Sequence, residues 1–174
     1  ELDIFIPSKS IAIEYDGLHW HNEIMDRITP SFHLHKTELC NEKGVRLIHI
    51  FEDEWLEKPQ IVKSMLKNIL GATANYIYAR QCEVRNVDSM TATQFLDDNH
   101  IQGQCKSKYY YGLYYKGELV SLMTFSKAKL HRKNNEDYEN TWELLRFCNK
   151  LDTTVVGGAS KLLKHFIGEV KPIK

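Results

Sequence analysis

The sequence predicts a mixed α/β fold in two parts, residues 1–74 and 75–174. In the first part, two short apolar strands precede a helix and a third apolar strand, an order typical of a sheet with one crossover helix. In the second part, a helix precedes a β-hairpin, a further strand and a final helix. Around residues 72–78 the apolar pattern changes, and we place the boundary between the parts there.

The composition is that of a globular chain without a membrane role. Hydrophobic residues make up 43% and charged residues 26% of the chain, and no apolar run approaches the ~18 residues that a membrane span needs. Lys plus Arg and Asp plus Glu number 23 each, so the basic excess of a dedicated DNA-binding domain is missing. A locally basic surface beside acidic metal ligands stays compatible with this balance.

The cysteines, the missing signal peptide and the chain ends each lead to a further expectation. The 4 cysteines include no C-x-x-C pair, which predicts neither a disulfide framework nor a zinc ribbon. The absence of a signal peptide agrees with a cytoplasmic protein. Because the chain opens inside a strand without Met and stops just after a helix, we expect the first part to lack an N-terminal helix and the second to be truncated at its C-terminus.

The first two strands are predicted as an antiparallel hairpin. Residues 2–6 alternate apolar and other side chains, residues 11–15 are strand-like again, and the Pro7-Ser8-Lys9-Ser10 segment between them has turn chemistry. Gly17 then ends the second strand, and a polar loop of undefined structure reaches Pro30.

A helix and a third strand follow this loop. Residues 31–43 have helical character, with Leu34 and Leu39 as expected core contacts and Gly44 as the residue that stops the helix. Residues 46–51 are apolar enough for a central strand. Its connection to the hairpin through a helix predicts that it runs parallel to the second strand.

The remaining elements follow from local apolar patterns and turn residues. They are, in order, an amphipathic helix at 61–70, a helix at 90–99, a hairpin of 109–115 and 118–125 turned by Lys116-Gly117, a strand at 142–148, a small-residue loop at 156–159, and a helix opening at Ser160 as its cap.

Three carboxylates are expected to meet at one end of the first hairpin. Asp3 lies on the first strand, whereas Glu14 and Asp16 lie two residues apart on the second and so share a face. Their repulsion calls for a cation, and Mg²⁺ (or Mn²⁺) on Asp3 and Glu14 suits the preference of that ion for oxygen ligands. His21, just beyond the strand, would activate water or protonate the leaving oxygen in phosphodiester hydrolysis. The residue types alone leave solvated carboxylates and an ordinary loop histidine as an equal alternative.

These segments resemble the core of Vsr-type endonucleases and of phage homing endonucleases with the same fold. Members carry an Asp on the first strand, a hydrophobic second strand that runs into a Gly and a Trp-His pair, and a later strand that closes with an acidic residue. The matching positions here are Asp3, Gly17, Trp20 with His21, and Glu52. The resemblance implies a restriction-endonuclease-like fold, a divalent metal and cleavage of double-stranded DNA, with Asp3 as a metal ligand and His21 as the catalytic histidine.

The chain departs from that family in three respects. Asp16 stands where the mismatch-repair enzymes use a histidine, which favours the homing-type branch found in phages and mobile elements. No Lys follows Glu14 at the spacing used by the wider superfamily, and Lys36 on the next helix would supply that positive charge to the scissile phosphate. A solvated helix lysine is the equal alternative, and the same holds for His33 and His35. We find no cysteine and histidine set for the structural zinc of the family and predict none.

The second part resembles the first half of the GNAT acetyltransferase fold, as used by phage DNA-modification proteins of the Mom type. Residues 154–159 fall where that family has Gln/Arg-x-x-Gly-x-Gly/Ala, a loop whose N–H groups bind the coenzyme A pyrophosphate. This implies acetyl-CoA binding at Gly157, Gly158 and Ala159, although Thr154 replaces the usual Gln or Arg. A plain strand-to-helix turn is the alternative.

Three functions therefore remain open from the sequence. The first is a metal-dependent DNA endonuclease of a phage or mobile element, with Asp3, Glu14 and Asp16 around the metal and His21 assisting. The second is an acyl-CoA-dependent DNA-modification protein whose first part only binds DNA. The third is a non-catalytic DNA-binding module with solvated carboxylates.

Overall fold

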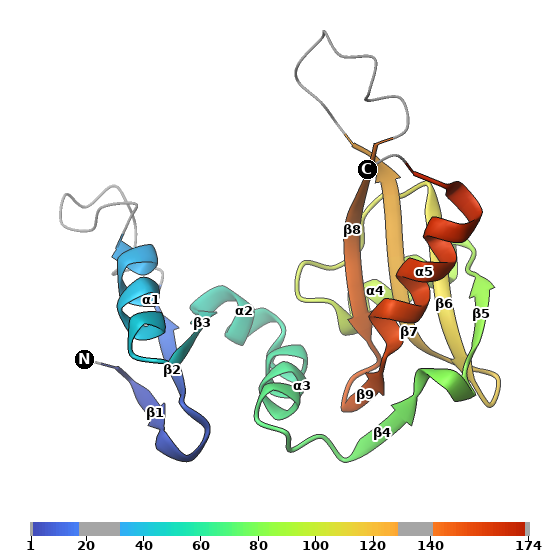
Figure 1. Ribbon diagram of the computed structural model, residues 1–174. Coiled ribbons are helices and arrows are strands. Elements are labelled where there is room, and N and C mark those ends of the chain that lie inside the picture. Colours follow the sequence, from blue (N-terminus) through green and yellow to red (C-terminus); the bar gives the residue numbers. More distant parts are fainter. Residues whose placement is uncertain (1, 18–31, 129–140, 173–174) are drawn as a thin grey trace, which may run out of the picture. The chain divides into compact units, whose positions relative to one another are not determined.

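The computed structural model describes residues 2–17, 32–128 and 141–172 (Figure 1). It has the mixed α/β architecture that the sequence predicts. The chain divides into two compact units, Glu1–Val62 and Lys63–Lys174, and the division falls inside helix α3 (Pro59–Ile69). The division lies earlier in the chain than the domain boundary expected after residue 74, and the domain assignment itself stays a prediction.

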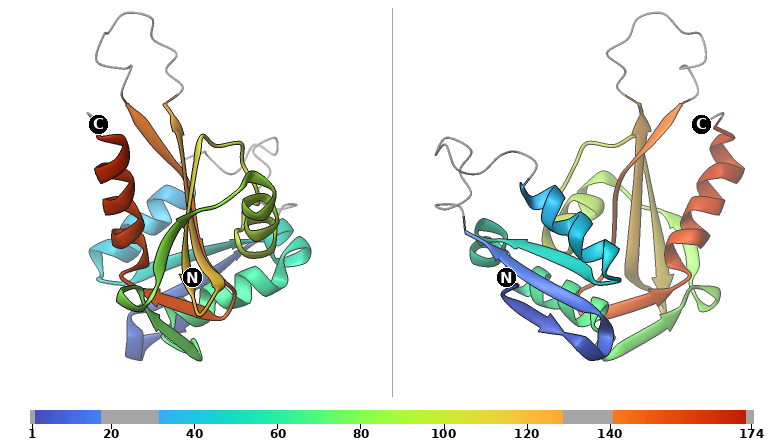
Figure 2. Two further views of the ribbon diagram at one scale, coloured as in Figure 1. Left: turned by 90° about the vertical axis from the view of Figure 1, so that its right-hand side faces the viewer. Right: turned by 60° about the vertical axis from the view of Figure 1, so that its left-hand side comes forward.

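The first unit contains a three-stranded sheet in the order β1-β2-β3, with α1 over one face (Figure 2). Strand β1 runs antiparallel to β2 and β2 runs parallel to β3, which confirms the predicted hairpin and crossover. The elements are β1 (Ile4–Ile6), the 3-10 turn η1 (Pro7–Lys9), β2 (Ile11–Asp16), α1 (Phe32–Glu42), β3 (Arg46–Phe51) and α2 (Glu52–Glu57).

The inward face of α1 differs from the prediction. Leu34 and Leu39 were the expected core contacts, but they are 58% and 43% exposed. Cys40 instead packs with Ala12 of β2 and Leu47 of β3. The prediction was wrong because it assumed that the apolar side chains of a helix face the sheet, whereas most of the residues that α1 turns toward the sheet are polar.

The second unit contains a four-stranded antiparallel sheet in the order β5-β6-β7-β8 with one helix on each face (Figure 2). Leu162 and Phe166 of α5 pack on one face and Ala92 and Leu96 of α4 on the other. The elements are β4 (Asn75–Tyr78), η2 (Ala79–Gln81), β5 (Glu83–Asn86), α4 (Ser89–Asn99), β6 (Tyr109–Tyr115), β7 (Glu118–Lys127), β8 (Trp142–Asn149), β9 (Thr153–Val156) and α5 (Gly158–Val170).

The β6–β7 hairpin is confirmed, and its turn uses two left-handed residues. Lys116 and Gly117 have φ values of 51° and 86°, as a two-residue turn that matches the twist of the strands requires. Strands β4, β5 and β9 were not predicted from the sequence. Strand β5 pairs with β6, and β4 and β9 pair in parallel as a separate two-stranded sheet. Each has 4 residues, the shortest run over which an alternating pattern can be recognised.

The start of α5 also differs from the prediction. Ser160 was the expected cap, but the helix begins at Gly158 and its N-cap is Gly157, with φ of 77° and no side-chain hydrogen bond. Among the described residues, no helix has both the length and the apolar character needed to cross a membrane.

Two glycine-to-alanine substitutions of opposite sign test this fold. We expect Gly157→Ala to lower the free energy of unfolding by about 1–2 kcal/mol, because a residue with a Cβ is strained at positive φ. The added Cβ would meet Ala79 at 3.8 Å, an ordinary contact, so the cost is conformational. Gly168→Ala, on the exposed side of α5, should raise the free energy by up to about 1 kcal/mol. Urea unfolding followed by circular dichroism measures both, and changes of equal sign would contradict the assignment.

Candidate functional site

Helix α1 presents a polar stripe to the sheet of the first unit. His33, Lys36, Thr37 and Cys40 are spaced by three, one and three residues, which places them on one face of the helix. Lys36 contacts Glu14 of β2, Thr37 contacts His49 of β3, and Cys40 joins the small apolar cluster beneath the helix. The helix is therefore held over the sheet largely by polar contacts.

Strand β2 supplies two carboxylates to the surface that α1 covers. Ala12, Glu14 and Asp16 alternate along the strand and so point to one face, and all three are buried. In the parallel pairing with β3, Ala12 lies opposite Leu47 and Glu14 opposite His49. Because directly opposite residues of paired strands point to the same side, His49 projects beneath α1 beside the carboxylates.

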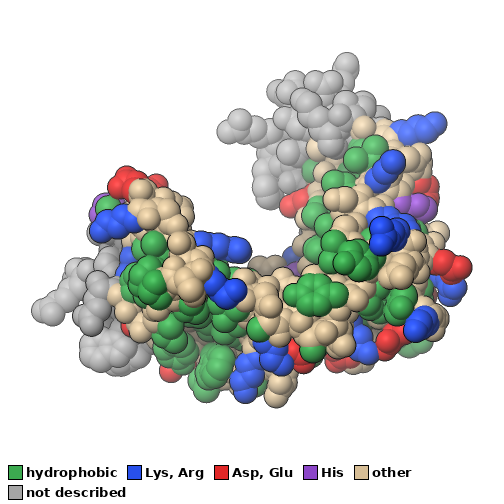
Figure 3. Space-filling model, turned by 60° about the horizontal axis from the view of Figure 1, so that its bottom comes forward, with side chains coloured by type: hydrophobic (Ala, Val, Ile, Leu, Met, Phe, Trp, Pro, Cys, Tyr) green, Lys and Arg blue, Asp and Glu red, His purple; other side chains and the backbone are tan. Residues whose placement is uncertain are grey.

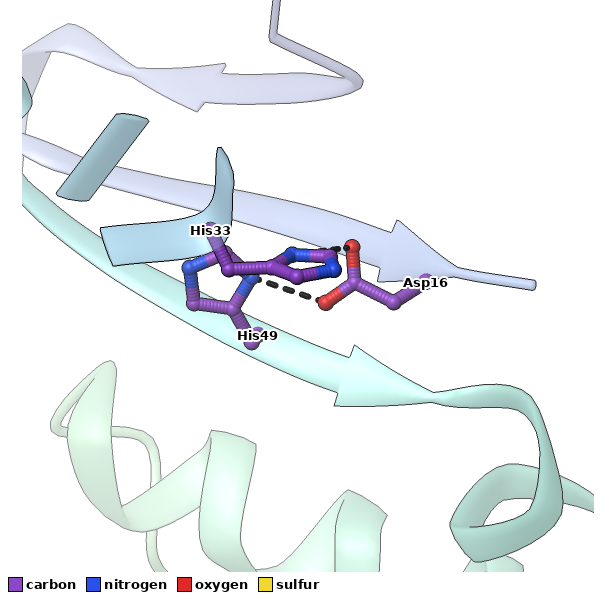
Figure 4. A group of neighbouring side chains, drawn as sticks. All are labelled: Asp16, His33 and His49. Carbon is purple, nitrogen blue, oxygen red and sulfur yellow. Dashed lines mark hydrogen bonds and ion pairs between the residues drawn. The ribbon is translucent and has the colours of Figure 1, made fainter. Parts of the chain in front are cut away.

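Asp16, His33 and His49 converge into one cluster (Figure 4). The Nδ1 atom of His49 lies 2.8 Å from Oδ2 of Asp16, and the Nδ1 atom of His33 lies 3.5 Å from Oδ1. One potential ligand atom from each residue lies within 4.8 Å of the other two. The side chain of Asp16 is 0% exposed, whereas the histidine side chains are 29% and 19% exposed. The cluster thus combines a buried carboxylate with two partly accessible imidazoles.

The hydroxyl group of Thr37 affects which ring nitrogen of His49 carries a proton. Its Oγ1 lies 2.8 Å from the carbonyl oxygen of His33 and 3.0 Å from Nε2 of His49. When the hydroxyl donates to His49, Nε2 is the acceptor and the ring proton on Nδ1 is donated to Asp16. When the hydroxyl donates to the carbonyl oxygen of His33, it accepts a hydrogen bond from the Nε2–H group of His49, and Nδ1 faces Asp16 either as an N–H group or with a free lone pair. A lone pair opposite a carboxylate oxygen is satisfied only by a proton or a metal ion between them.

Glu14 and Lys36 form an ion pair next to this cluster. The Lys36 ammonium donates to Oε1 of Glu14, and their side chains are 20% and 12% exposed. Oε2 of Glu14 is buried and has no hydrogen-bond partner among the residues that the structure describes. A buried carboxylate oxygen in that state is a ready acceptor for water or for a proton.

The structure brings together some of the residues predicted for the site and separates others. Glu14 and Asp16 share the covered face of β2 as expected, and Lys36 is an ion-pair partner of Glu14. Asp3 is exposed, and its Oδ2 accepts a hydrogen bond of 2.8 Å from the backbone N–H of Tyr15. It is not a member of the Asp16 cluster. His21 lies outside the described residues.

Sequence reasoning missed two members of the cluster. His49 was interpreted only as part of an apolar strand. His33 was interpreted either as a source of positive charge near the site or as a solvated residue of the helix. The three-and-four spacing of His33 with Lys36 and Thr37 was a usable signal, since it places them on one helical stripe. His49 could be assigned to the same face only once the register with β2 was known.

The glycine loop of the second unit has a structural explanation of its own. A Cβ on Gly158 would lie 3.1 Å from Cγ1 of Val155 and 3.4 Å from Cδ1 of Leu113, so close packing already favours glycine there. The Lys161 ammonium donates to the carbonyl oxygens of Ala79 and Cys82 at 2.9 and 2.6 Å, which holds α5 to η2. Coenzyme A binding at Gly157, Gly158 and Ala159 stays a prediction.

Comparison with known proteins does not assign the chain to a family. No protein-family model, curated protein or solved structure matches it. The resemblances to Vsr-type endonucleases and to GNAT proteins therefore depend on the sequence motifs alone.

The Glu14–Lys36 pair is testable by a double-mutant cycle. We expect Lys36→Met to lower the free energy of unfolding by about 1–3 kcal/mol, somewhat less than for a fully buried pair, because Glu14 keeps its buried charge without a counter-charge. Glu14→Gln combined with Lys36→Met should cost clearly less than the sum of the single changes. Urea unfolding curves provide the values. Additive losses would show that the two side chains do not interact.

Proposed function

We propose that this chain is a metal-dependent endonuclease that hydrolyses phosphodiester bonds of double-stranded DNA, of the homing type found in phages and mobile elements. The observation that carries the proposal is the convergence of Asp16, His33 and His49 beside the Glu14–Lys36 pair. Carboxylates, imidazoles and an ammonium group gathered beneath one helix are the groups that phosphodiester hydrolysis uses. The sequence resemblance to Vsr-type enzymes points to the same reaction.

A divalent ion fits the site at Asp16 better than at Asp3. Asp3 is exposed and hydrogen-bonded to the backbone of β2, and Glu14 is paired with Lys36. Asp16, His33 and His49 instead offer one oxygen and two nitrogen donors at ligand spacing. Bound there, a divalent ion would polarise a phosphoryl oxygen and activate a water molecule.

The chain's own residues then have separate roles. Lys36 exchanges part of its contact with Glu14 for a non-bridging phosphate oxygen and thereby neutralises charge that builds up in the transition state. Oε2 of Glu14 accepts a hydrogen bond from the attacking water and orients it. His21 assists the leaving oxygen, a role that comes from the family resemblance.

The distribution of surface charge favours DNA binding through a few local contacts, not through a large excess of positive charge. On the face shown in Figure 3, Lys and Arg side chains are interspersed with Asp and Glu side chains, in keeping with the equal totals of basic and acidic residues. Binding strength on such a surface depends on a few phosphate contacts, so its dependence on salt should be modest for a DNA-binding protein.

Cleavage of supercoiled plasmid is the direct test. With Mn²⁺ we expect nicked or linear DNA from the wild-type chain, or from a version extended at both ends, and Mg²⁺ is tested in parallel. Glu14→Gln and Asp16→Asn should each reduce the rate at least about 100-fold, the scale of lost transition-state stabilisation at a catalytic charge. Glu38→Gln, an exposed carboxylate on α1, is the matched control and should cleave at the wild-type rate.

Asp3→Ala separates the two candidate ligand sets, and His21→Ala tests the predicted catalytic histidine. If the metal is held at Asp16, Asp3→Ala still cleaves DNA and Asp16→Asn does not. If the metal is held by Asp3 and Glu14, Asp3→Ala loses cleavage and Asp16→Asn retains it. His21→Ala should slow cleavage without altering the metal requirement. A folded, DNA-binding chain that leaves the plasmid intact with every ion would refute the endonuclease.

A further inference from the structure

We propose that Asp16, His33 and His49 form a transition-metal centre that selects ions such as Zn²⁺, Co²⁺ and Mn²⁺ over Mg²⁺. The centre differs from the magnesium site that the sequence suggested, both in its ligands and in its preferred ion. Its catalytic use rests on the proposed function, whereas metal binding itself follows from the three side chains alone.

The spacing of the donor atoms fits one ion. Two ligands at bond lengths of about 2.0–2.1 Å in a tetrahedral site lie roughly 3.3 Å apart. Oδ2 of Asp16 lies 2.8 Å from Nδ1 of His49, and Oδ1 lies 3.5 Å from Nδ1 of His33, on either side of that value. All three donor atoms lie within 4.8 Å of one another. The three side chains are therefore close enough to share one ion.

The three ligands come from separate elements that fix their directions. Asp16 is the last residue of β2, His49 lies on β3 and His33 on the first turn of α1. The rings of His33 and His49 pack edge to face, with centroids 5.4 Å apart and an angle of 84° between their planes. The ring of Phe51 also packs against His33 in a T-shaped arrangement, with ring centroids 6.3 Å apart. This packing limits rotation of the imidazoles and keeps their Nδ1 atoms directed at the carboxylate.

Thr37 gives His49 the second contact that a metal-bound histidine requires. A ligating histidine usually donates its other N–H to a carboxylate, carbonyl or hydroxyl group, which fixes the tautomer. With the Thr37 hydroxyl donating to the His33 carbonyl, Oγ1 accepts from Nε2 of His49 and leaves the Nδ1 lone pair for the ion. Thr37 is therefore a positioning residue for His49.

The donor types decide which ion is preferred. Mg²⁺ selects oxygen ligands and keeps most of its water, whereas imidazole suits Zn²⁺, Co²⁺ and other transition ions. Two imidazoles and one carboxylate carry one negative charge, so a divalent ion leaves the centre with one net positive charge. Three protein ligands leave positions open for water and a phosphate oxygen, as in catalytic rather than structural sites.

The test is metal binding by the metal-free, untagged chain, measured by thermal unfolding and by the visible absorption of Co²⁺. We expect Zn²⁺, Co²⁺ and Mn²⁺ to raise the melting temperature and an equal concentration of Mg²⁺ to leave it unchanged, because an ion bound only by the folded state stabilises it. Co²⁺ should show the intensified visible absorption of a four-coordinate site. His33→Gln and His49→Gln should lose this absorption, and His35→Gln, an exposed histidine on the same helix, should keep it.

Thr37 provides a second measurement that does not remove a ligand. Thr37→Val should weaken Co²⁺ binding about 10- to 100-fold, the usual effect of losing such a contact, and Thr37→Ser should restore it. An absorption band that survives His49→Gln, equal stabilisation by Mg²⁺, or unchanged affinity in Thr37→Val would overturn the inference. These readouts are interpreted for variants whose circular dichroism without metal matches that of the wild-type chain.

The two proposals fail in distinguishable ways. Co²⁺ binding with the expected variant pattern but no cleavage of DNA with any ion supports the metal centre and refutes the endonuclease. Cleavage with Mg²⁺ that persists in His49→Gln supports an endonuclease and overturns the centre as the place where its metal binds.

Discussion

The arrangement of the first unit depends on the burial of the Asp16 carboxylate. The residue is 1% exposed, and an ionised carboxylate at such a position is costly unless it is hydrogen-bonded or paired with positive charge. His49 on β3 and His33 on α1 supply the partners. Because these histidines belong to different elements, the carboxylate links the position of the helix to the register of the two parallel strands.

Helices α1 and α5 are held to their sheets by different forces. In the second unit, α5 packs through Leu162 and Phe166, and the ring of Phe166 stacks on Phe125 with a centroid distance of 3.7 Å. In the first unit, Cys40 is the member of α1 in the buried apolar cluster, and the other inward contacts are polar. Polar contacts are directional, so they define the position of α1 closely, but they add little net stability. Helix α1 is therefore the element whose stability should respond most to a bound ion.

The parts of this fold that follow simple periodicities could be predicted from the sequence, and the site could be predicted only in part. Strand alternation placed Glu14 and Asp16 on one face, and the crossover rule gave the parallel β2–β3 pair. The face of α1 was predicted wrongly, because Leu34 looked like a core residue and a polar inward face has no apolar signature. The partner of Asp16 on β3 depends on register, which is set by long-range pairing and is not encoded in any local pattern.

The two neighbouring carboxylates of β2 have partners with different chemistry, and this difference separates their roles. Glu14 is neutralised by Lys36, whose ammonium is a donor only and cannot coordinate an ion. Asp16 is contacted by imidazoles, which bind either a proton or a metal ion at the same nitrogen. Metal binding at Asp16 therefore uses imidazole donors that already face the carboxylate, whereas an ion at Glu14 would lie beside the positive charge of Lys36. Of the two carboxylates, Asp16 is the one already prepared for a metal ion, and Glu14 with Lys36 is left for water and phosphate.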